Sequence, residues 1–179
     1  MTIQEYIHTV NTRFKSGISG EHSYRGDLES LIKSIVPGIE ITNEPINVTT
    51  CGNPDYVITK KKIPIGYIEA KDIDKDLNSH QFNEQFVRYK RALDNLIITD
   101  YISFKFFQHG ELIQEVRIAD IEKNVIKPIP ENFQLFEDRI KDFCTFIGIT
   151  IKSAKKLAEM MAAKARLLQN ILEHAITSD

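Results

Sequence analysis

The sequence is short of cysteine, of long apolar runs and of net charge, and each shortage excludes a class of protein. Its two cysteines, Cys51 and Cys144, form neither a disulfide framework nor a metal-ligand pattern. Without a signal peptide or an apolar run long enough to cross a membrane, we expect a cytoplasmic protein with no membrane contact. The formal net charge of −2 gives no general attraction to nucleic acid, so any such site would have to be a local basic patch.

Motifs of several common chemistries are missing as well. The histidines have no zinc-site spacing, and no Ser/His/Asp or Cys/His arrangement, glycine-rich phosphate loop or dinucleotide-binding fingerprint stands out. The sequence has no repeats or low-complexity segments. What remains is a chain of 179 residues, 42% of them hydrophobic, which is enough to bury a core in one domain or in one domain with an appendage.

The most informative stretch, residues 52–71, predicts two β-strands and a turn. Residues 56–59 and 63–70 are rich in apolar and β-branched side chains, and the three lysines at 60–62 separate them as a solvated connection. Asp55 stands where the first strand begins, directly after a proline-containing turn. If the two strands pair, Asp55 therefore comes close to the end of the second strand.

Three charged residues at the ends of these strands suit one chemistry. Strand side chains alternate between faces, so Glu69 and Lys71 share the face opposite the buried one. Asp55 and Glu69 supply the hard oxygen ligands of Mg²⁺, which polarises a phosphoryl oxygen and acidifies a bound water. The Lys71 ammonium can position that water and offset charge in the transition state. The pattern predicts metal-assisted phosphodiester cleavage; a hairpin with a surface ion pair is the simpler alternative.

The same residues resemble a known motif. Pro54-Asp55 and Glu69-Ala70-Lys71 are similar to the PD-(D/E)xK motif of the restriction-endonuclease-like superfamily. The glycine before the first pair and the apolar run that leads into the second strengthen the resemblance. It implies an α/β fold in which a mixed sheet is flanked by helices on both sides.

Further residues could complete such a site. On a predicted helix over residues 79–93, Gln85 and Tyr89 resemble the extra motif of RecB-like nucleases, which implies that Gln85 helps to orient the site and Tyr89 supports it. A surface glutamine and a core-edge tyrosine are the alternative. Nucleases of this superfamily often add a first-helix glutamate to the metal site, and Glu21 matches that position better than Glu29. An acidic residue favoured by the helix dipole is the alternative for each.

Hydrophobic periodicity extends the α/β prediction along the chain. Helices are expected over residues 2–15, 24–36, 79–93 and 133–146, and strands over 39–42, 46–50, 56–59, 63–70, 96–99, 101–107 and 112–118. Two prolines near residue 128 predict a linker, so we expect a nuclease domain at 1–127 and a helical extension or connector at 128–179.

The last predicted helix begins near residue 150. Apolar and small residues recur in it every three to four positions, which is typical of a seam for close helix packing: Ala154, Ala158, Met161, Ala165, Leu168, Leu172 and Ala175. Such a seam could pack within the chain, or could meet another domain or protomer.

Taken together, residues 21 to about 120 resemble the N-terminal nuclease module of single-polypeptide Type I (Type ISP) restriction–modification enzymes and related Type IIG-like fusions. The resembling words are Glu21-His22-Ser23-Tyr24-Arg25, Thr42-Asn43-Glu44-Pro45, Gly52-Asn53-Pro54-Asp55, Ile65-Gly66-Tyr67-Ile68-Glu69-Ala70-Lys71-Asp72, Gln85-Phe86-Val87-Arg88-Tyr89 and Leu96-Ile97-Ile98-Thr99-Asp100-Tyr101.

This resemblance implies cleavage of double-stranded DNA with Mg²⁺, for which Mn²⁺ can substitute. It implies a site with Asp55, Glu69, Lys71 and Gln85 in catalysis and Asp55, Glu69 and Glu21 on the metal. It also implies partners, namely helicase, methyltransferase and target-recognition domains. The sequence contains none of their motifs, so we expect an excised domain or a stand-alone relative.

Two other functions stay open from the sequence. The first is a DNA repair or recombination nuclease of the same superfamily, which would share the chemistry and differ in substrate. The second is a non-catalytic DNA-binding or assembly module that uses the fold as a scaffold. The intact set of Asp55, Glu69 and Lys71 favours an enzyme over a scaffold.

Overall fold

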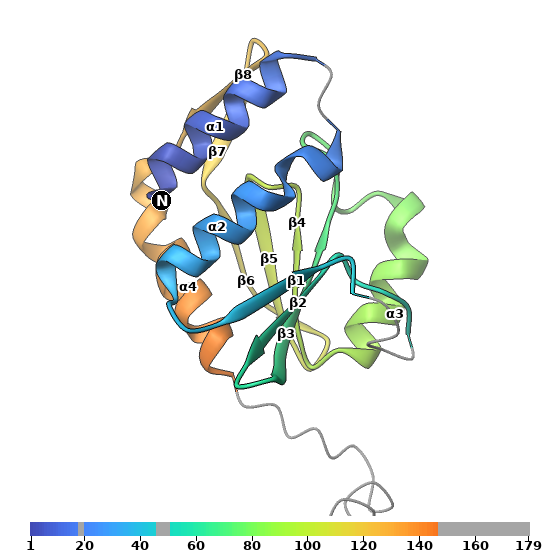
Figure 1. Ribbon diagram of the computed structural model, residues 1–179. Coiled ribbons are helices and arrows are strands. Elements are labelled where there is room, and N and C mark those ends of the chain that lie inside the picture. The colour runs from blue at the N-terminus through green and yellow to red at the C-terminus, as the bar shows by residue number, and fades with distance from the viewer. Residues whose placement is uncertain (18–19, 46–50, 147–179) are drawn as a thin grey trace, which may run out of the picture. The chain divides into compact units, whose positions relative to one another are not determined.

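A computed structural model describes residues 1–17, 20–45 and 51–146 (Figure 1). The elements are, in chain order, α1 (Ile3–Lys15), the one-turn helix η1 (Glu21–Tyr24), α2 (Arg25–Ile35), β1 (Glu40–Asn43), β2 (Tyr56–Lys60), β3 (Ile63–Ala70), η2 (His80–Phe82), α3 (Asn83–Ala92), β4 (Asn95–Thr99), β5 (Ser103–Gln108), β6 (Glu111–Arg117), β7 (Ala119–Glu122), β8 (Val125–Pro128), η3 (Pro130–Asn132) and α4 (Phe133–Thr145).

Six strands form one mixed sheet in the order β1-β2-β3-β4-β5-β6. Neighbouring strands are antiparallel except β3 and β4, which are parallel because α3 lies between them in the chain and returns it to the same end of the sheet. The C-terminal ends of β3 and β4 therefore meet at one edge. The predicted mixed sheet is confirmed, with β3 and β4 at its centre.

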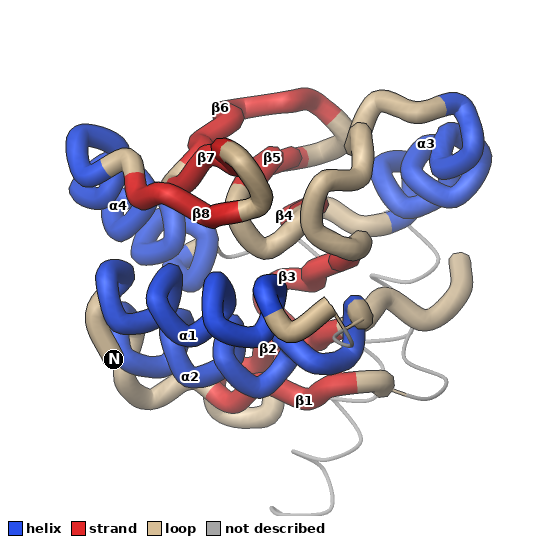
Figure 2. The backbone as a smooth tube through the Cα atoms, turned by 90° about the horizontal axis from the view of Figure 1, so that it is seen from above, coloured by secondary structure: helices blue, strands red, loops and turns tan. Residues whose placement is uncertain are grey.

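Helices cover both faces of this sheet, as predicted (Figure 2). The larger core lies on one face, where α1, α2 and α4 bury apolar residues against β2, β3, β4 and β5. The smaller core lies on the other face, where α3 packs against Leu96, Ile98 and Phe107. The strands between the two cores are buried on both sides, which explains why residues 96–99 read as a continuous apolar run.

The helices have clear local causes. Thr2 caps α1, because its hydroxyl accepts from the Glu5 amide while the Glu5 carboxylate accepts from the Thr2 amide. In α4, Phe136, Ile140 and Phe143 recur at helical spacing and are all buried in the larger core. The Phe136 ring lies 4.6 Å from the ring of Phe104 on β5, centre to centre. α4 is therefore an integral part of the sheet's helical cover.

The sequence missed one hairpin and misplaced one boundary. Strands β7 and β8 pair through a two-residue turn, Lys123 and Asn124, whose φ angles of 50° and 62° belong to a tight hairpin turn. The linker predicted near residue 128 instead joins β8 to α4. By its contacts the chain divides into Met1–Ile147 and Gly148–Asp179. The expected boundary at 127/128 therefore falls inside the first unit, since α4 is buried there.

Several expectations concern residues that the structure does not describe. The strand expected at 46–50 and the helix from residue 150, with its seam of small residues, lie outside the described residues. The helix predicted over 79–93 is present as η2 followed by α3. Among the described residues, no helix is long and apolar enough to cross a membrane.

Candidate active site at the end of strand β3

The hairpin of β2 and β3 builds the site, as residues 52–71 predicted. Tyr56 pairs with Ile68 and Lys60 with Ile63 in an antiparallel register. Lys61 and Lys62 form the turn with φ angles of 51° and 64°, which is the two-residue hairpin geometry that suits twisted strands. This register places the start of β2 beside the end of β3, where the candidate residues stand.

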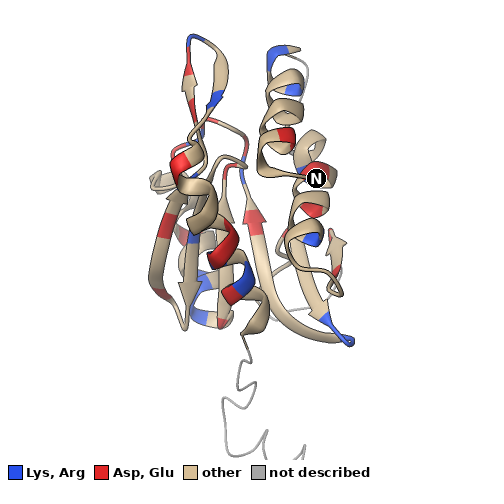
Figure 3. Cartoon of the chain, turned by 90° about the vertical axis from the view of Figure 1, so that its left-hand side faces the viewer, with Lys and Arg blue, Asp and Glu red and all other residues tan. Residues whose placement is uncertain are grey.

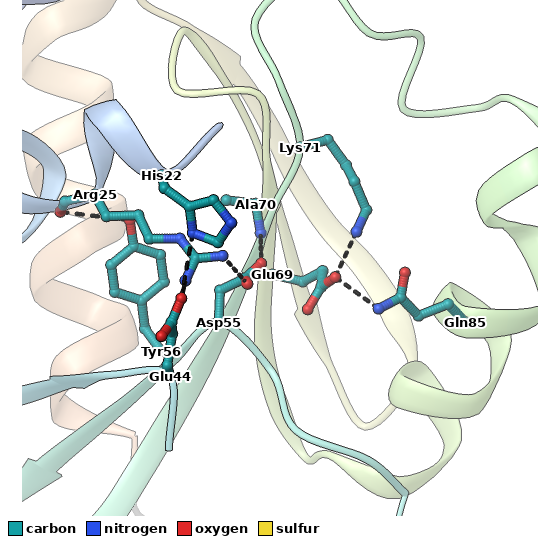
Figure 4. Close-up of polar contacts among 9 residues, drawn as sticks. All are labelled: His22, Arg25, Glu44, Asp55, Tyr56, Glu69, Ala70, Lys71 and Gln85. Atoms are coloured by element: carbon teal, nitrogen blue, oxygen red, sulfur yellow. Dashed lines mark hydrogen bonds and ion pairs between the residues drawn. The ribbon is translucent and has the colours of Figure 1, made fainter. Parts of the chain in front are cut away.

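Asp55 is fixed from two directions. Its Oδ2 accepts a hydrogen bond of 2.8 Å from the amide of Ala70, and its Oδ1 accepts one of 2.5 Å from Nη2 of Arg25. The first contact ties the carboxylate to the β3 backbone directly after Glu69. The strand pairing therefore brings Asp55 to the end of β3, as expected (Figure 4).

Glu69 is the most buried member of the site, with 2% of its surface exposed. Its Oε1 accepts hydrogen bonds from Nζ of Lys71 at 2.6 Å and from Nε2 of Gln85 at 2.7 Å. Glu69 and Lys71 thus share one face of β3, while Ile68 and Ala70 are buried in the larger core on the opposite face. The contact with Gln85 brings α3 to the site, as the resemblance implied.

Aromatic side chains enclose the amine of Lys71. Its Nζ lies 5.3 Å from the ring centre of Phe82 and 5.9 Å from that of Phe86, within the range of a cation–π contact. Nearby, Gln85 shares a hydrogen bond with Tyr89, whose pKa is raised mainly by burial. Tyr89 therefore contacts the glutamine that holds Glu69.

The structure adds Arg25 and Glu44, to which the sequence gave no role. Arg25 begins α2, and its side chain is only 9% exposed. Its Nη1 donates to Oε1 of Glu44 at 2.6 Å, and Nδ1 of His22 lies 3.2 Å from the same oxygen. A signal was present: Arg25 stands at helical spacing from Leu28 and Ile32 on the buried face, where a charge needs a partner.

Not every candidate is brought to the site. Glu21 begins η1, and its side chain lies outside the described part of the structure. Glu29 lies one turn beyond Arg25 on α2, where it accepts hydrogen bonds from Lys33 and Asn43. Neither contact joins Glu29 to Asp55 or Glu69, although its partner Asn43 pairs with Tyr56 next to Asp55.

The donor set can be compared with what a metal needs. Among the described residues, no three His, Cys, Asp or Glu side chains are grouped to hold a metal ion. The site does offer two carboxylates, those of Asp55 and Glu69, from neighbouring strands. Mg²⁺ is commonly held by one or two carboxylates together with waters and substrate phosphates, so this pair fits Mg²⁺ or Mn²⁺.

The comparisons with known proteins concern the fold. No known protein family and no curated protein matches the chain. Seven chains of solved structures do match. One belongs to a cryo-EM structure of a DrdV–DNA complex, with a TM-score of 0.59 and 20% sequence identity; the match covers 81% of this chain and 14% of that chain. The chain therefore has a fold that also occurs within a much longer protein.

Proposed function

We propose that this chain is a metal-dependent DNA endonuclease of the restriction type. The carrying observation is that Asp55 and Glu69 both stand at the end of β3, each with its own cationic partner. The fold match to the DrdV–DNA complex supports DNA as the substrate. The PD-(D/E)xK resemblance supports phosphodiester hydrolysis, in which water adds to phosphorus and one ester bond breaks.

In this proposal Asp55 and Glu69 hold Mg²⁺, or Mn²⁺ in its place. The bound ion supplies Lewis-acid polarisation of the phosphate and a more acidic water. Other residues of the chain orient the two carboxylates for this role. The Ala70 amide fixes one oxygen of Asp55, and Gln85 fixes one oxygen of Glu69. Both carboxylates are thus oriented before any ligand arrives, so little ordering is needed during the reaction.

Lys71 acts on the water and the phosphate. An ammonium at the end of β3 can donate to the attacking water and offset the charge that develops on phosphorus-bound oxygens. The rings of Phe82 and Phe86 lie beside the amine, and the Lys71 side chain is mostly buried, which restricts its freedom. We assign Lys71 the positioning of the nucleophile, and Gln85 the support of Glu69.

The wider setting is part of the proposal. The match covers 14% of the DrdV chain, as a module of a larger protein would. We propose that helicase, methyltransferase and target-recognition functions act with this nuclease from other domains or subunits. Glu21 stays a candidate third metal ligand. It begins η1 and is followed by His22, which contacts Glu44.

A plasmid assay tests the proposed activity. Supercoiled DNA is incubated with the protein and Mg²⁺ or Mn²⁺, and nicked and linear products are counted. Asp55→Asn and Glu69→Gln should each lower cleavage by several orders of magnitude, because each removes a metal-binding charge without changing side-chain size. Glu137→Gln is the matched control, since Glu137 is a carboxylate on α4 that pairs with Lys141 of the same helix.

The same assay separates the alternatives. Full cleavage by both site variants would contradict the assignment of Asp55 and Glu69 to the metal site. DNA binding without metal-dependent cleavage by the intact protein would instead indicate a scaffold module. Efficient cleavage of branched or damaged DNA, with little on plasmid, would favour a repair or recombination nuclease of the same superfamily.

A further inference from the structure

Arg25 bridges two carboxylates of different surroundings. Its Nη2 contacts Asp55, whose side chain is 15% exposed, and its Nη1 contacts Glu44, whose side chain is 65% exposed. A guanidinium keeps its charge at every pH at which proteins are stable, so the bridge is always ionic. One end of Arg25 therefore belongs to the candidate site and the other to the surface.

The two oxygens of Asp55 differ in how firmly they are held. Oδ2 accepts from the Ala70 amide, which is part of the β3 backbone. Oδ1 accepts from the Arg25 side chain, which can move without breaking the sheet. Oδ1 is therefore the oxygen whose partner a metal ion can replace most readily.

The balance of charge at the site also favours a metal ion next to Asp55. The carboxylates of Glu44, Asp55 and Glu69 face the cations Arg25 and Lys71, so these five groups carry a formal charge of −1. A divalent ion with one phosphodiester would bring the sum to zero. Arg25 supplies one positive charge at Asp55, where a divalent ion would supply two, and close carboxylates need such compensation.

Glu44 is held in place by its backbone. Its φ angle of 50° lies in the left-handed region, which a residue other than glycine adopts at a cost. The Glu44 amide donates to the Asp55 carbonyl at 2.8 Å, so β1 and β2 fix this conformation next to the site. Strained residues of this kind gather at ligand clamps and switches, and here the strain sets a carboxylate against Arg25.

We propose that Arg25 is a positioning residue that competes with the metal for Asp55, and that Glu44 keeps the guanidinium when the metal binds. This inference rests on the proposed function. It assigns Asp55 a built-in counter-ion and gives a surface residue, Glu44, an effect on metal affinity. The fold alone requires neither this counter-ion nor this effect of Glu44.

The test measures Mn²⁺ affinity by titration calorimetry on the full chain without DNA, so that it is independent of cleavage. Arg25→Gln should tighten Mn²⁺ binding about tenfold, the scale on which one adjacent charge acts at a carboxylate. Glu44→Gln should weaken it severalfold, because the loss of the Glu44 charge strengthens the hold of Arg25 on Asp55. Arg13→Gln is the matched control, since Arg13 pairs with Asp27 at 2.7 Å and should leave the affinity unchanged.

The double variant shows whether Glu44 acts through Arg25. In the Arg25→Gln background, Glu44→Gln should change the affinity by less than twofold, whereas two independent charges would give additive effects. Additive effects overturn the proposal, and so does unchanged affinity in both single variants. If Arg25→Gln does not fold, Glu44→Gln still decides, because an unchanged affinity in that variant is sufficient to reject the proposal.

The outcomes for this inference and for the proposed function can be told apart. Asp55→Asn reports whether Mn²⁺ binds at the site at all. Binding that depends on Asp55 but is indifferent to Arg25 and Glu44 removes this inference and leaves the nuclease proposal standing. Absence of Asp55-dependent binding removes both.

Discussion

At the residue scale, the candidate site is a set of charges that compensate one another. Glu69 is almost fully buried, and the hydrogen bonds from Lys71 and Gln85 help to stabilise its carboxylate there. Asp55 depends in the same way on Arg25 and the Ala70 amide. Each charged residue thus has a structural partner as well as a proposed chemical role, so its variants must be assayed for folding and for rate separately.

Lys71→Ala separates chemistry from DNA binding. We expect the single-turnover cleavage rate to fall by orders of magnitude, because the variant lacks the amine that we propose positions the water. DNA affinity should change little, since one phosphate contact is a small share of binding. Lys141→Ala serves as a control, because Lys141 pairs with Glu137 of the same helix, α4. If affinity falls as steeply as the rate, Lys71 is a binding residue instead.

Asp100 predicts a pH dependence of stability. Burial raises the pKa of its carboxyl, although the Ser103 and Ile102 amides donate to it and oppose the shift. A pKa raised by folding means that the folded state holds the proton longer, so stability falls as pH rises from the unfolded pKa to the folded one. Above both values the penalty of the buried charge is complete.

The substitution Asp100→Asn tests this sign. It removes the charge and keeps an oxygen that can accept the same two amide hydrogens. The variant should therefore unfold at a higher temperature than the natural protein at pH 7 to 8, and the difference should shrink as the pH is lowered. A difference that grows toward acid pH would contradict the raised pKa. Thermal melts followed by circular dichroism provide the measurement.

At the element scale, the close packing of α4 on β3 supports the strand that carries Glu69. The side-chain amide of Asn95 on β4 donates to the backbone carbonyls of Ile65 and Phe143, which links β3, β4 and the end of α4. Gly66 permits this approach: a Cβ added there would lie 2.4 Å from Cζ of Phe143 and 2.9 Å from Nδ2 of Asn95. The central strand and its helix therefore meet at a residue without a side chain.

Gly66→Ala should lower the free energy of unfolding by about 1–3 kcal/mol, the usual cost of forcing an extra methyl group into a packed core. Gly26→Ala is the matched control, because nothing lies within 4 Å of an added Cβ at that position of α2. The control should gain about 0.4–1 kcal/mol through the reduced freedom of its unfolded chain. Denaturant unfolding of both variants gives the comparison. Equal stabilities would show that Phe143 moves aside without cost.

At the scale of the whole molecule, charge gives little guidance toward DNA. The net charge is −2, and acidic and basic residues are interspersed over the elements that Figure 3 shows. Such a surface provides little long-range attraction to a polyanion. The residues assigned in the described part of the chain serve the core and the site, whereas base reading needs an element that enters a groove with matched side chains.

We therefore expect the chain alone to bind DNA weakly, with affinity that falls steeply as salt rises, and to cut without a preferred sequence. Cleavage of a plasmid library at low salt, with Mg²⁺ or Mn²⁺, followed by sequencing of the ends, measures this. The Asp55→Asn variant controls for contaminating nucleases. One dominant recognition sequence would contradict the expectation, and would place a reading element in this chain.

The sequence determined the local elements and the hairpin of β2 and β3. Runs of apolar and β-branched residues specify both strands, whose buried stretches include consecutive residues. The alternation of side chains along a strand places Glu69 and Lys71 on one face. The hairpin β7–β8 was not predicted from the sequence, because its strands are short and its turn, Lys123-Asn124, lacks the glycine that usually marks such turns.

Tertiary structure decided what each charge touches. Arg25 and Glu44 are 19 positions apart, and Arg25 and Asp55 are 30 apart, so no local pattern predicts that one guanidinium bridges both carboxylates. The packing of α4 against β3 through Gly66 likewise depends on how helix and sheet meet in space. Periodicity fixes the face on which a side chain lies, because it is a property of the backbone; its partner across the fold is fixed only when distant segments pack.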